Sequence, residues 1–572
     1  VRLPQRAFYP WPRLSLLFFE TLGECSRMIL SIVAAAIDGA RWEPPRSAPA
    51  MPRGKWSADP LFATHVAARR SPLVFRDALT TLPLLRSPGT WSIEDVAQSG
   101  MTLSHVRVSS EGLFEHYPPV QDNVSLRERA GASLGAAPPY ERTYDVVDAM
   151  SAEAFFAGSA ATRSQFMQYS RHILDWEETA LFGDLSLPVL RSLGVEPSND
   201  DAPRFPEANL WLATAGASSS AHWDAVENFF VQLAGTKRFT VWATADAANL
   251  HPYPALHPSW FKSQIRDMGR VLRYRRRWNG SDVDAAHGAQ ERAALDSLAT
   301  RFPLLRAVDW AHAYEVTLYP GDVLYIPPLA MHYADALTDA VGLSVYTASR
   351  ANAHSRAAER LPLPFDADAW SDETMAIAVA VFLRLVAERL ALPEPARCAA
   401  GPGATAGADV CAAEGASATS ALVERLLASR YVLWREVPHA SATRCFASKR
   451  ALGSNSQLAS ESAPDQEPTL LLSCSRATLW GRPDVVPPRG AHLRALNEKF
   501  KRYANDVADR FAAISGSNAT REVWLADYIE RLVYATLGPR RHGAAPDVIV
   551  GCSTTLGGRS IVPYLRAVAE RC

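Results

Sequence analysis

The chain has 572 residues, and its 59 Lys and Arg residues nearly balance its 60 Asp and Glu residues. This length allows two to four domains, or one large domain with appendages. The near-zero net charge excludes a generally basic nucleic-acid binder, but it leaves open a local basic patch. A composition of 48% hydrophobic and 21% charged residues excludes a mainly disordered chain.

The cysteines indicate a reducing compartment. Residues 26–397 contain none of the seven, and no two cysteines form a CxxC pair. We therefore expect neither a disulfide framework nor a structural zinc site, and we predict a cytoplasmic or nuclear protein. The apolar stretch 14–36 is interrupted by Glu20, Glu24 and Arg27, which predicts no membrane span. Because the sequence starts at Val1 rather than Met, we expect it to be incomplete at this end, with any targeting segment upstream.

The first 200 residues carry no motif of their own. Residues 1–64 are rich in proline and arginine and predict a poorly ordered leader. Residues 151–156 and 163–174 have a helix-like pattern. Between 205 and 350 the pattern changes to short β-type runs separated by turn residues such as Gly321. These runs cover residues 209–213, 229–233, 237–242, 314–318, 323–326 and 341–347. Many short strands with tight turns predict a sandwich or a barrel.

After residue 360 the pattern becomes helical. A predicted helix at 371–392 places Met375, Val379, Phe382, Val386 and Leu390 on one face, and a second helix is predicted at 420–434. Together they form a helical appendage, 361–440, with a flexible Ala- and Gly-rich insertion at 396–419. A polar linker follows at 441–468. The last segment, 469–572, is predicted to be a helical extension without a catalytic motif.

The sharpest chemical feature is the triplet His222-Trp223-Asp224. On a strand, His222 and Asp224 point to the same face and could chelate one metal ion. His332 follows the predicted strand 323–326 and supplies a third ligand. Two histidines and one carboxylate form the facial triad that holds non-haem Fe(II) and leaves positions open for substrate and O2. Zinc remains the competing metal, although no general base accompanies the three residues.

An oxygenase of this type also needs an electron donor, and 2-oxoglutarate is the usual one. Its distal carboxylate requires a cation inside the barrel. Lys237 fits this role because strand alternation places it on the same face as Phe239 and Val241. The alternative is a solvated lysine on an ordinary strand.

The segment 209–242 carries a family resemblance, with the sequence NLWLATAGASSSAHWDAVENFFVQLAGTKRFTVW. Together with residues 250–254 and 319–332, it resembles the JmjC-type cupin-like 2-oxoglutarate oxygenases, most of all the asparaginyl hydroxylase that inhibits the hypoxia-inducible factor. The resemblance implies a mixed α+β fold in which residues 65–360 form a double-stranded β-helix, or jelly-roll, core with flanking helices. It also implies that His222, Asp224 and His332 bind Fe(II).

The same resemblance assigns further site residues. It implies that Lys237 and Ser219 hold 2-oxoglutarate and that Asn228, Tyr346 and Tyr169 lie in the cosubstrate pocket. On the substrate side it points to Gln168, Phe261 and Lys262. This chain departs from the relative in three places: Phe166 aligns with a tyrosine, Tyr346 replaces an asparagine, and Phe261-Lys262 replaces an Arg-Gln pair. We therefore expect a different peptide target.

Two further features concern partners. The helices at 371–392 and 420–434 resemble the pair through which that hydroxylase dimerises, so they predict a homodimer, with ordinary core packing as the alternative. An insertion absent from the relative carries six arginines between Arg266 and Arg277. They form either a solvated face or a docking site for an acidic protein segment or RNA.

The resulting hypothesis is an Fe(II)- and 2-oxoglutarate-dependent dioxygenase that hydroxylates a protein side chain. Two alternatives stay open: an RNA-modifying hydroxylase of the same fold, and a non-catalytic cupin-like interaction module. Lysine demethylation is less favoured by the motif details but is not excluded by them.

Overall fold

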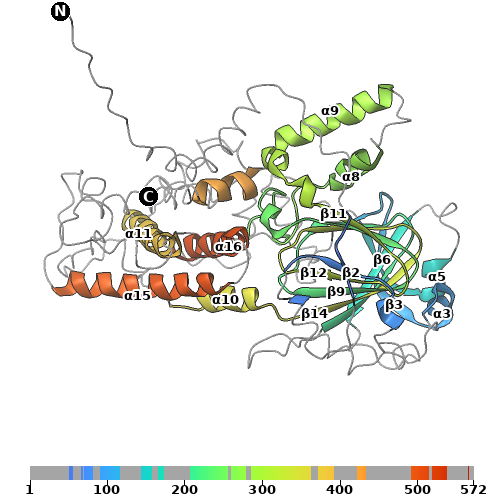
Figure 1. Ribbon diagram of the computed structural model, residues 1–572, viewed down its shortest axis with the longest axis horizontal. Helices are drawn as coiled ribbons and strands as arrows, with labels where there is room; N and C mark the ends of the chain where they lie inside the picture. Colours follow the sequence, from blue (N-terminus) through green and yellow to red (C-terminus); the bar gives the residue numbers. More distant parts are fainter. Residues whose placement is uncertain are drawn as a thin grey trace, which may run out of the picture.

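The computed structural model describes the parts of the chain that form the site and the helices beside it (Figure 1). The described residues are 50–55, 66–67, 70–80, 91–115, 144–157, 165–172, 207–255, 259–277, 285–362, 372–391, 422–432, 491–514 and 518–537, together with Leu565. The predicted flexible insertion 396–419 and the predicted linker 441–468 lie outside them.

Eight antiparallel strands form the core. Four lie next to one another in the larger sheet, in the order β12 (Val323–Ile326), β9 (Glu227–Ala234), β14 (Ala340–Thr347) and β7 (Glu207–Ala213). The smaller sheet contains β11 (Tyr314–Leu318), β10 (Lys237–Val241), β13 (His332–Ala336) and β8 (Ser218–His222). Consecutive strands alternate between the two sheets, except that β10 pairs with β11. This is the double-stranded β-helix, so the predicted fold class is confirmed.

Additional strands extend both sheets. The larger sheet gains β2 (Leu73–Phe75) and β1 (Arg53–Gly54) at one edge and β6 (Phe166–His172), β3 (Thr102–Ser109) and β5 (Asp145–Ser151) at the other, and β4 (Leu113–Phe114) joins the smaller sheet. Two expectations need correction here. The predicted leader contributes β1, and its Met51 is buried in the core between the sheets. The helix expected at 163–174 is strand β6, because its residues pair with β3 and β7.

Strand β9 is covered on both of its faces. Phe229 and Val231 point outward into a cluster that includes Val96 of α3 (Ile93–Gln98) and Phe155 of α5 (Ala152–Phe156). Phe230 points the other way, into the core shared by the two sheets. Every residue of β9 is buried, including the polar residues Glu227, Asn228 and Gln232, so both faces of the strand are covered. The β9–β10 turn requires glycine: Gly235 has φ +66°, and a Cβ there would lie 1.8 Å from the carbonyl oxygen of Asp339.

A group of helices lies beside the barrel (Figure 1). It consists of α10 (Arg350–Glu359), α11 (Asp372–Ala391), the helix 422–430, α15 (Ala491–Ala513) and α16 (Asn518–Leu537). Met375, Val379, Phe382 and Val386 of α11 are buried in one cluster with residues of α15 and α16, and the rings of Phe382 and Phe500 lie 6.3 Å apart. This face of α11 is thus covered by the same chain, which favours the alternative of ordinary core packing for it. None of the described helices is long and apolar enough to cross a membrane.

Candidate metal centre

The three predicted metal ligands come together at adjacent ends of β8 and β13. The ligand atoms of His222, Asp224 and His332 all lie within 4.8 Å of one another. His222 and His332 are direct cross-strand partners, and His332 Nε2 lies 3.9 Å from Asp224 Oδ2. The pairing shifts register so that β8 has an extra residue between Ser219 and His222. Such bulges re-aim side chains and are common beside active sites.

Backbone carbonyl groups fix the tautomers of both histidines. His222 Nδ1 lies 2.7 Å from the carbonyl oxygen of Ser220, and His332 Nδ1 lies 3.1 Å from that of Ala330. Because a carbonyl oxygen only accepts hydrogen bonds, each Nδ1 carries the proton and donates it. The acceptor lone pair of each ring is then on Nε2, as metal ligation by a neutral imidazole requires.

Asn228 supports the carboxylate ligand. Its Nδ2 donates a hydrogen bond to Asp224 Oδ2 at 3.1 Å, from the neighbouring strand β9. The prediction placed Asn228 among the cosubstrate contacts, whereas its described bond orients a metal ligand. Two neutral imidazoles and one oriented carboxylate suit Fe(II) in a facial triad, so the donor set fits a non-haem iron ion.

A strained turn connects the two ligand-bearing segments. Leu329 has φ +64°, which is uncommon for a bulky residue, and its N–H donates to the carbonyl oxygen of Asp224 at 2.8 Å. The next carbonyl, that of Ala330, accepts from His332. Leu329 is fully buried, so its packing can hold a conformation that costs about 1–3 kcal/mol. The turn therefore fixes Asp224 relative to His332.

A cavity of about 320 Å³ opens onto His222 and Asp224 of the triad. It is lined by Phe114, Gln168, Ser170, Asn209, Trp211, Ser219, Ser220, His222, Trp223, Asp224, Ala225, Trp260, Phe261, Lys262 and Tyr346. Five predicted cosubstrate or substrate residues are therefore brought together here, namely Gln168, Ser219, Phe261, Lys262 and Tyr346. Gln168 Nε2 donates to Ser219 Oγ at 2.9 Å. The volume and the mixture of aromatic and amide groups are typical of a small-ligand site.

Lys237 is buried inside the barrel but is not among the residues that line the cavity. It shares its strand face with Phe239 and Val241, which are part of the core between the sheets, and its Nζ lies 5.1 Å from the centre of the Phe230 ring. Burial lowers the pKa of Lys237 to about 8. The ammonium group is thus poorly solvated, so an anionic ligand that enters the barrel gains from pairing with it.

Tyr169 is not brought to the cavity. Gln168 and Ser170 line it, and Tyr169 alternates to the opposite face of β6, where it is buried among residues that include Phe155 and Leu212. Burial raises the pKa of its hydroxyl. The expected contact with the cosubstrate is therefore corrected. Phe166 shares the face of Gln168 but packs against Gly112 and Gly216.

The arginine-rich insertion is used largely within the protein. It forms α8 (Met268–Arg277), which is followed by α9 (Ala285–Arg301). Arg266 pairs with Glu115 at 3.0 Å, Arg275 is buried and donates to the carbonyl oxygen of Trp310, and Arg276 bridges Glu315 and Asp335. Tyr274 is buried as well, so it is not available to stack on a base. Among the arginine side chains that the structure describes in this segment, only Arg270 and Arg273 are exposed.

Several residues that line the cavity were missed from the sequence, among them Asn209, Trp211 and Trp260. Asn209 and Trp211 lie on the inward face of β7, and Trp260 precedes the predicted substrate residues. A period-two signal was present, because Asn209 and Trp211 alternate with Leu210 and Leu212, which are buried on the outer side. Which of the two faces of β7 points into the cavity depends on its pairing with β6.

The comparisons with known proteins agree with this geometry. The model of the cupin-like domain family matches residues 58–349, just over half of the chain. The chain belongs to this family. It is similar to Jumonji C domain-containing protein 5 of Drosophila melanogaster, with 30% identity over 31% of this chain and 36% of the relative.

Two further relatives carry demethylase names. Lysine-specific demethylase 8 of Xenopus tropicalis is 26% identical over 46% of this chain and 51% of the relative. Lysine-specific demethylase JMJ32 of Arabidopsis thaliana is 30% identical over 22% of this chain and 36% of the relative. The chain thus spans about a third to a half of the length of these curated relatives.

Proposed function

We propose that the protein is an Fe(II)- and 2-oxoglutarate-dependent dioxygenase that hydroxylates a protein side chain. The observation that carries this proposal is the convergence of His222, Asp224 and His332 within 4.8 Å, with both Nδ1 atoms engaged by carbonyl groups. When bound, iron with 2-oxoglutarate and O2 supplies the oxidation of a substrate C–H bond, with succinate and CO2 as co-products.

The residues around the triad have distinct roles in this proposal. The two Nε2 atoms and the Asp224 carboxylate hold iron, and Asn228 keeps the carboxylate oriented. Lys237 supplies the positive charge for the distal carboxylate of 2-oxoglutarate, and Ser219 supplies a hydroxyl group in the cavity wall. Gln168 orients that hydroxyl group and offers an amide to the substrate.

The charges in the cavity favour hydroxylation of a neutral side chain over lysine demethylation. Among the residues that line it, Asp224 is the only carboxylate, and it is a proposed metal ligand. Lys262, by contrast, is buried in the wall with only 1% of its surface exposed. A cationic lysine side chain in the cavity would lie near the buried positive charge of Lys262, whereas the amides of Gln168 and Asn209 suit a neutral amide. The names of two relatives make demethylation the second candidate.

An RNA-modifying hydroxylase and a non-catalytic interaction module have less support. Arg266, Arg275 and Arg276 bond within the chain, so Arg270 and Arg273 are the exposed arginines among those whose side chains are described in this segment. A non-catalytic module would not require two histidine tautomers fixed for metal ligation. The triad is the stronger argument for an enzyme.

The test is an incubation of the full chain with Fe(II), ascorbate and 2-oxoglutarate, followed by measurement of succinate. We expect turnover above that of the His222→Ala variant. A peptide library scored by mass then distinguishes the activities: hydroxylation adds one oxygen atom, whereas demethylation removes a methyl group and releases formaldehyde. Absence of both succinate formation and 2-oxoglutarate binding in the iron-loaded protein would favour the interaction module.

A further inference from the structure

We propose that α16 and the helix 422–430 position the metal centre and the adjoining wall of its cavity. Trp524 acts through Trp223, and Glu530 acts through the wall segment, whose described residues are 251–255 and 259–264. Neither helix contributes a residue to the described lining of the cavity, so both act through other groups. That these contacts matter for catalysis rests on the proposed function. The contacts themselves do not depend on it.

Trp223 is the link between α16 and the ligands. It lies between His222 and Asp224 in the chain, and its indole is buried. The ring centre of Trp524 lies 5.8 Å from that of Trp223 at an interplanar angle of 80°, and Trp260 packs edge-on against Trp223 at 4.6 Å. Such edge-to-face contacts fix the orientation of rings as well as burying them. Trp524 therefore packs against Trp223, the residue between the ligands His222 and Asp224.

The cavity wall is attached to the same strand end. The N–H of Trp223 donates to the carbonyl oxygen of Phe261 at 2.9 Å, and the N–H of Ser263 donates to that of Ala221 at 2.9 Å. These bonds place Lys262 as the bridge partner of His222. A displacement of this wall segment would consequently move both Lys262 and a metal ligand.

The helix 422–430 and α16 form hydrogen bonds with the wall segment. Gln264 Nε2 donates to the carbonyl oxygen of Arg430 at 2.9 Å, and His251 Nδ1 lies 2.9 Å from that of Ser429. The N–H of Ala255 donates to Glu530 Oε2 at 2.7 Å. The described part of the wall segment is thus bound at His251, Ala255 and Gln264.

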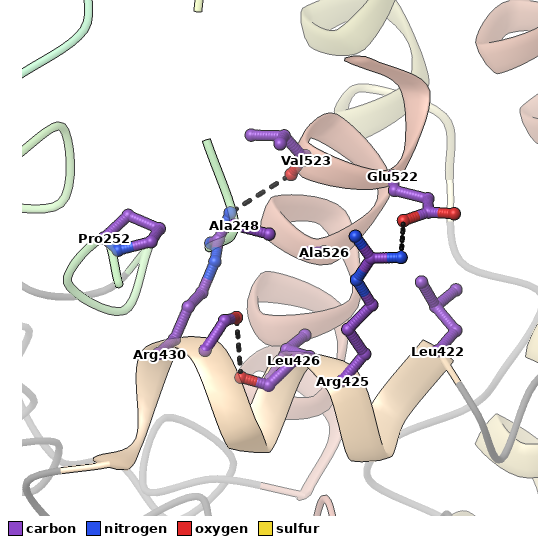
Figure 2. Close-up of a pocket in the computed structure, with 10 residues that line it drawn as sticks. Ala248, Pro252, Leu422, Arg425, Leu426, Arg430, Glu522, Val523 and Ala526 are labelled. Carbon is purple, nitrogen blue, oxygen red and sulfur yellow. Dashed lines mark hydrogen bonds and ion pairs between the residues drawn. The ribbon is translucent and has the colours of Figure 1, made fainter. Parts of the chain in front are cut away.

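An ionic network that is buried around Arg430 and partly exposed at Arg425 joins the two helices. Figure 2 shows Arg425 and Arg430 reaching from the helix 422–430 towards Glu522 and Val523 of α16. Arg430 also pairs with Asp527 and, at 2.9 Å, with Glu530, whose other oxygen accepts from the Tyr431 hydroxyl at 2.9 Å. Loss of one partner would leave a buried charge uncompensated, so the arrangement strongly favours one relative position of the helices.

The decisive experiment measures Co(II) binding to the full chain without cosubstrate. Trp524→Ala leaves a void behind Trp223, because a closely packed interior collapses only in part. We expect the dissociation constant for Co(II) to rise about tenfold and the Co(II) d–d absorption spectrum to change. Trp524→Phe should restore both. The control is Phe511→Ala, which removes a buried ring of α15 that packs on Tyr528 of α16.

The outcomes separate a positioning role from general destabilisation. Wild-type affinity and spectrum in Trp524→Ala would overturn the inference, and so would equal weakening in Phe511→Ala. If Trp524→Ala does not fold, Trp524→Leu with the same two readouts decides the question. A wild-type protein that binds Co(II) but forms no succinate would refute the proposed function and leave this inference standing.

Discussion

His222 and His332 are direct partners across the β8–β13 ladder, and the centres of their rings lie 4.2 Å apart. This pairing places two residues that are more than a hundred positions apart in the chain where both can bind one metal ion. Asp224 completes it because the turn at Leu329 binds the carbonyl group of Asp224 to the segment that carries His332. The relative positions of the three ligands are therefore set by strand pairing and by a single turn.

Removal of the amide at Asn228 should weaken metal binding without abolishing it. Asn228→Ala loses the hydrogen bond to Asp224 Oδ2, so we expect the dissociation constant for Fe(II) or Mn(II) to rise about tenfold. Asn209→Ala is the matched control, since Asn209 lines the cavity on another strand. Anaerobic titration measures both. Unchanged affinity in Asn228→Ala would contradict the assigned role.

Binding of 2-oxoglutarate should depend on the protonation of Lys237. Burial lowers its pKa to about 8, and only the charged form pairs with a carboxylate. We expect the dissociation constant to be constant below pH 8 and to rise about tenfold per pH unit above it. Lys237→Met should bind weakly at every pH. Calorimetry with Mn(II)-loaded protein tests this, and a wild-type affinity that is flat to about pH 9.5 would refute it.

Glu227 should make the protein less stable as the pH rises. Burial raises its pKa to about 7, despite the hydrogen bond from Tyr325 and the charge of Arg70. Because the folded-state pKa exceeds the unfolded value, its stabilisation is complete below about pH 4.5 and is lost as the pH passes 7. Glu227→Gln keeps an acceptor for Tyr325. Urea unfolding should show it more stable than the wild type at pH 8, by up to about 3 kcal/mol, and equal at pH 4. Unfolding free energies of the wild type and Glu227→Gln that change in parallel with pH would count against this account.

Lys262 should determine which side chain the cavity accepts. Lys262→Glu replaces the like charge opposite a cationic substrate with an attractive one. The ratio of kcat/KM for a methyl-lysyl peptide to that for an asparaginyl peptide should therefore rise about tenfold or more. Lys262→Gln should give an intermediate ratio. Ratios that do not follow the order Lys, Gln, Glu would show that this residue does not set the selectivity.

Substitutions at Tyr169 and at Ser219 should differ in their effects on the binding of 2-oxoglutarate. Ser219 lines the cavity and Tyr169 does not. We expect Ser219→Ala to raise the dissociation constant for 2-oxoglutarate several-fold, which corresponds to about 1 kcal/mol, and Tyr169→Phe to leave it unchanged. A larger effect from Tyr169→Phe would restore the expectation based on the family resemblance.

The core of the fold could be predicted because local patterns and turns agree there. The strands expected at 314–318 and 323–326 have the same bounds in the structure. Strand β6 could not be identified, because Phe166–His172 contains residues that suit a helix, and only pairing with β3 and β7 decides its conformation. The error at Tyr169 follows from this, since alternation excludes it from the cavity once Gln168 is known to face inward.

Long-range pairs account for the remaining differences. The arginines of α8 suggested a solvated face or a docking site, but Arg276 is paired with Glu315 of β11 and Asp335 of β13. The apolar face of α11 suggested a dimer, but its partners come from α15 and α16. The contact between Trp223 and Trp524 joins segments that share no sequence motif. Such pairings depend on the tertiary fold and leave no local signal.

The central claim is that His222, Asp224 and His332 bind Fe(II) in a form that 2-oxoglutarate can chelate. It is tested most directly by anaerobic addition of 2-oxoglutarate to the Fe(II)-loaded protein, with the visible absorption spectrum recorded. The account predicts a charge-transfer band between iron and the keto acid in the wild type and none in His332→Ala. A wild-type spectrum without this band, in protein shown to contain Fe(II), would contradict it.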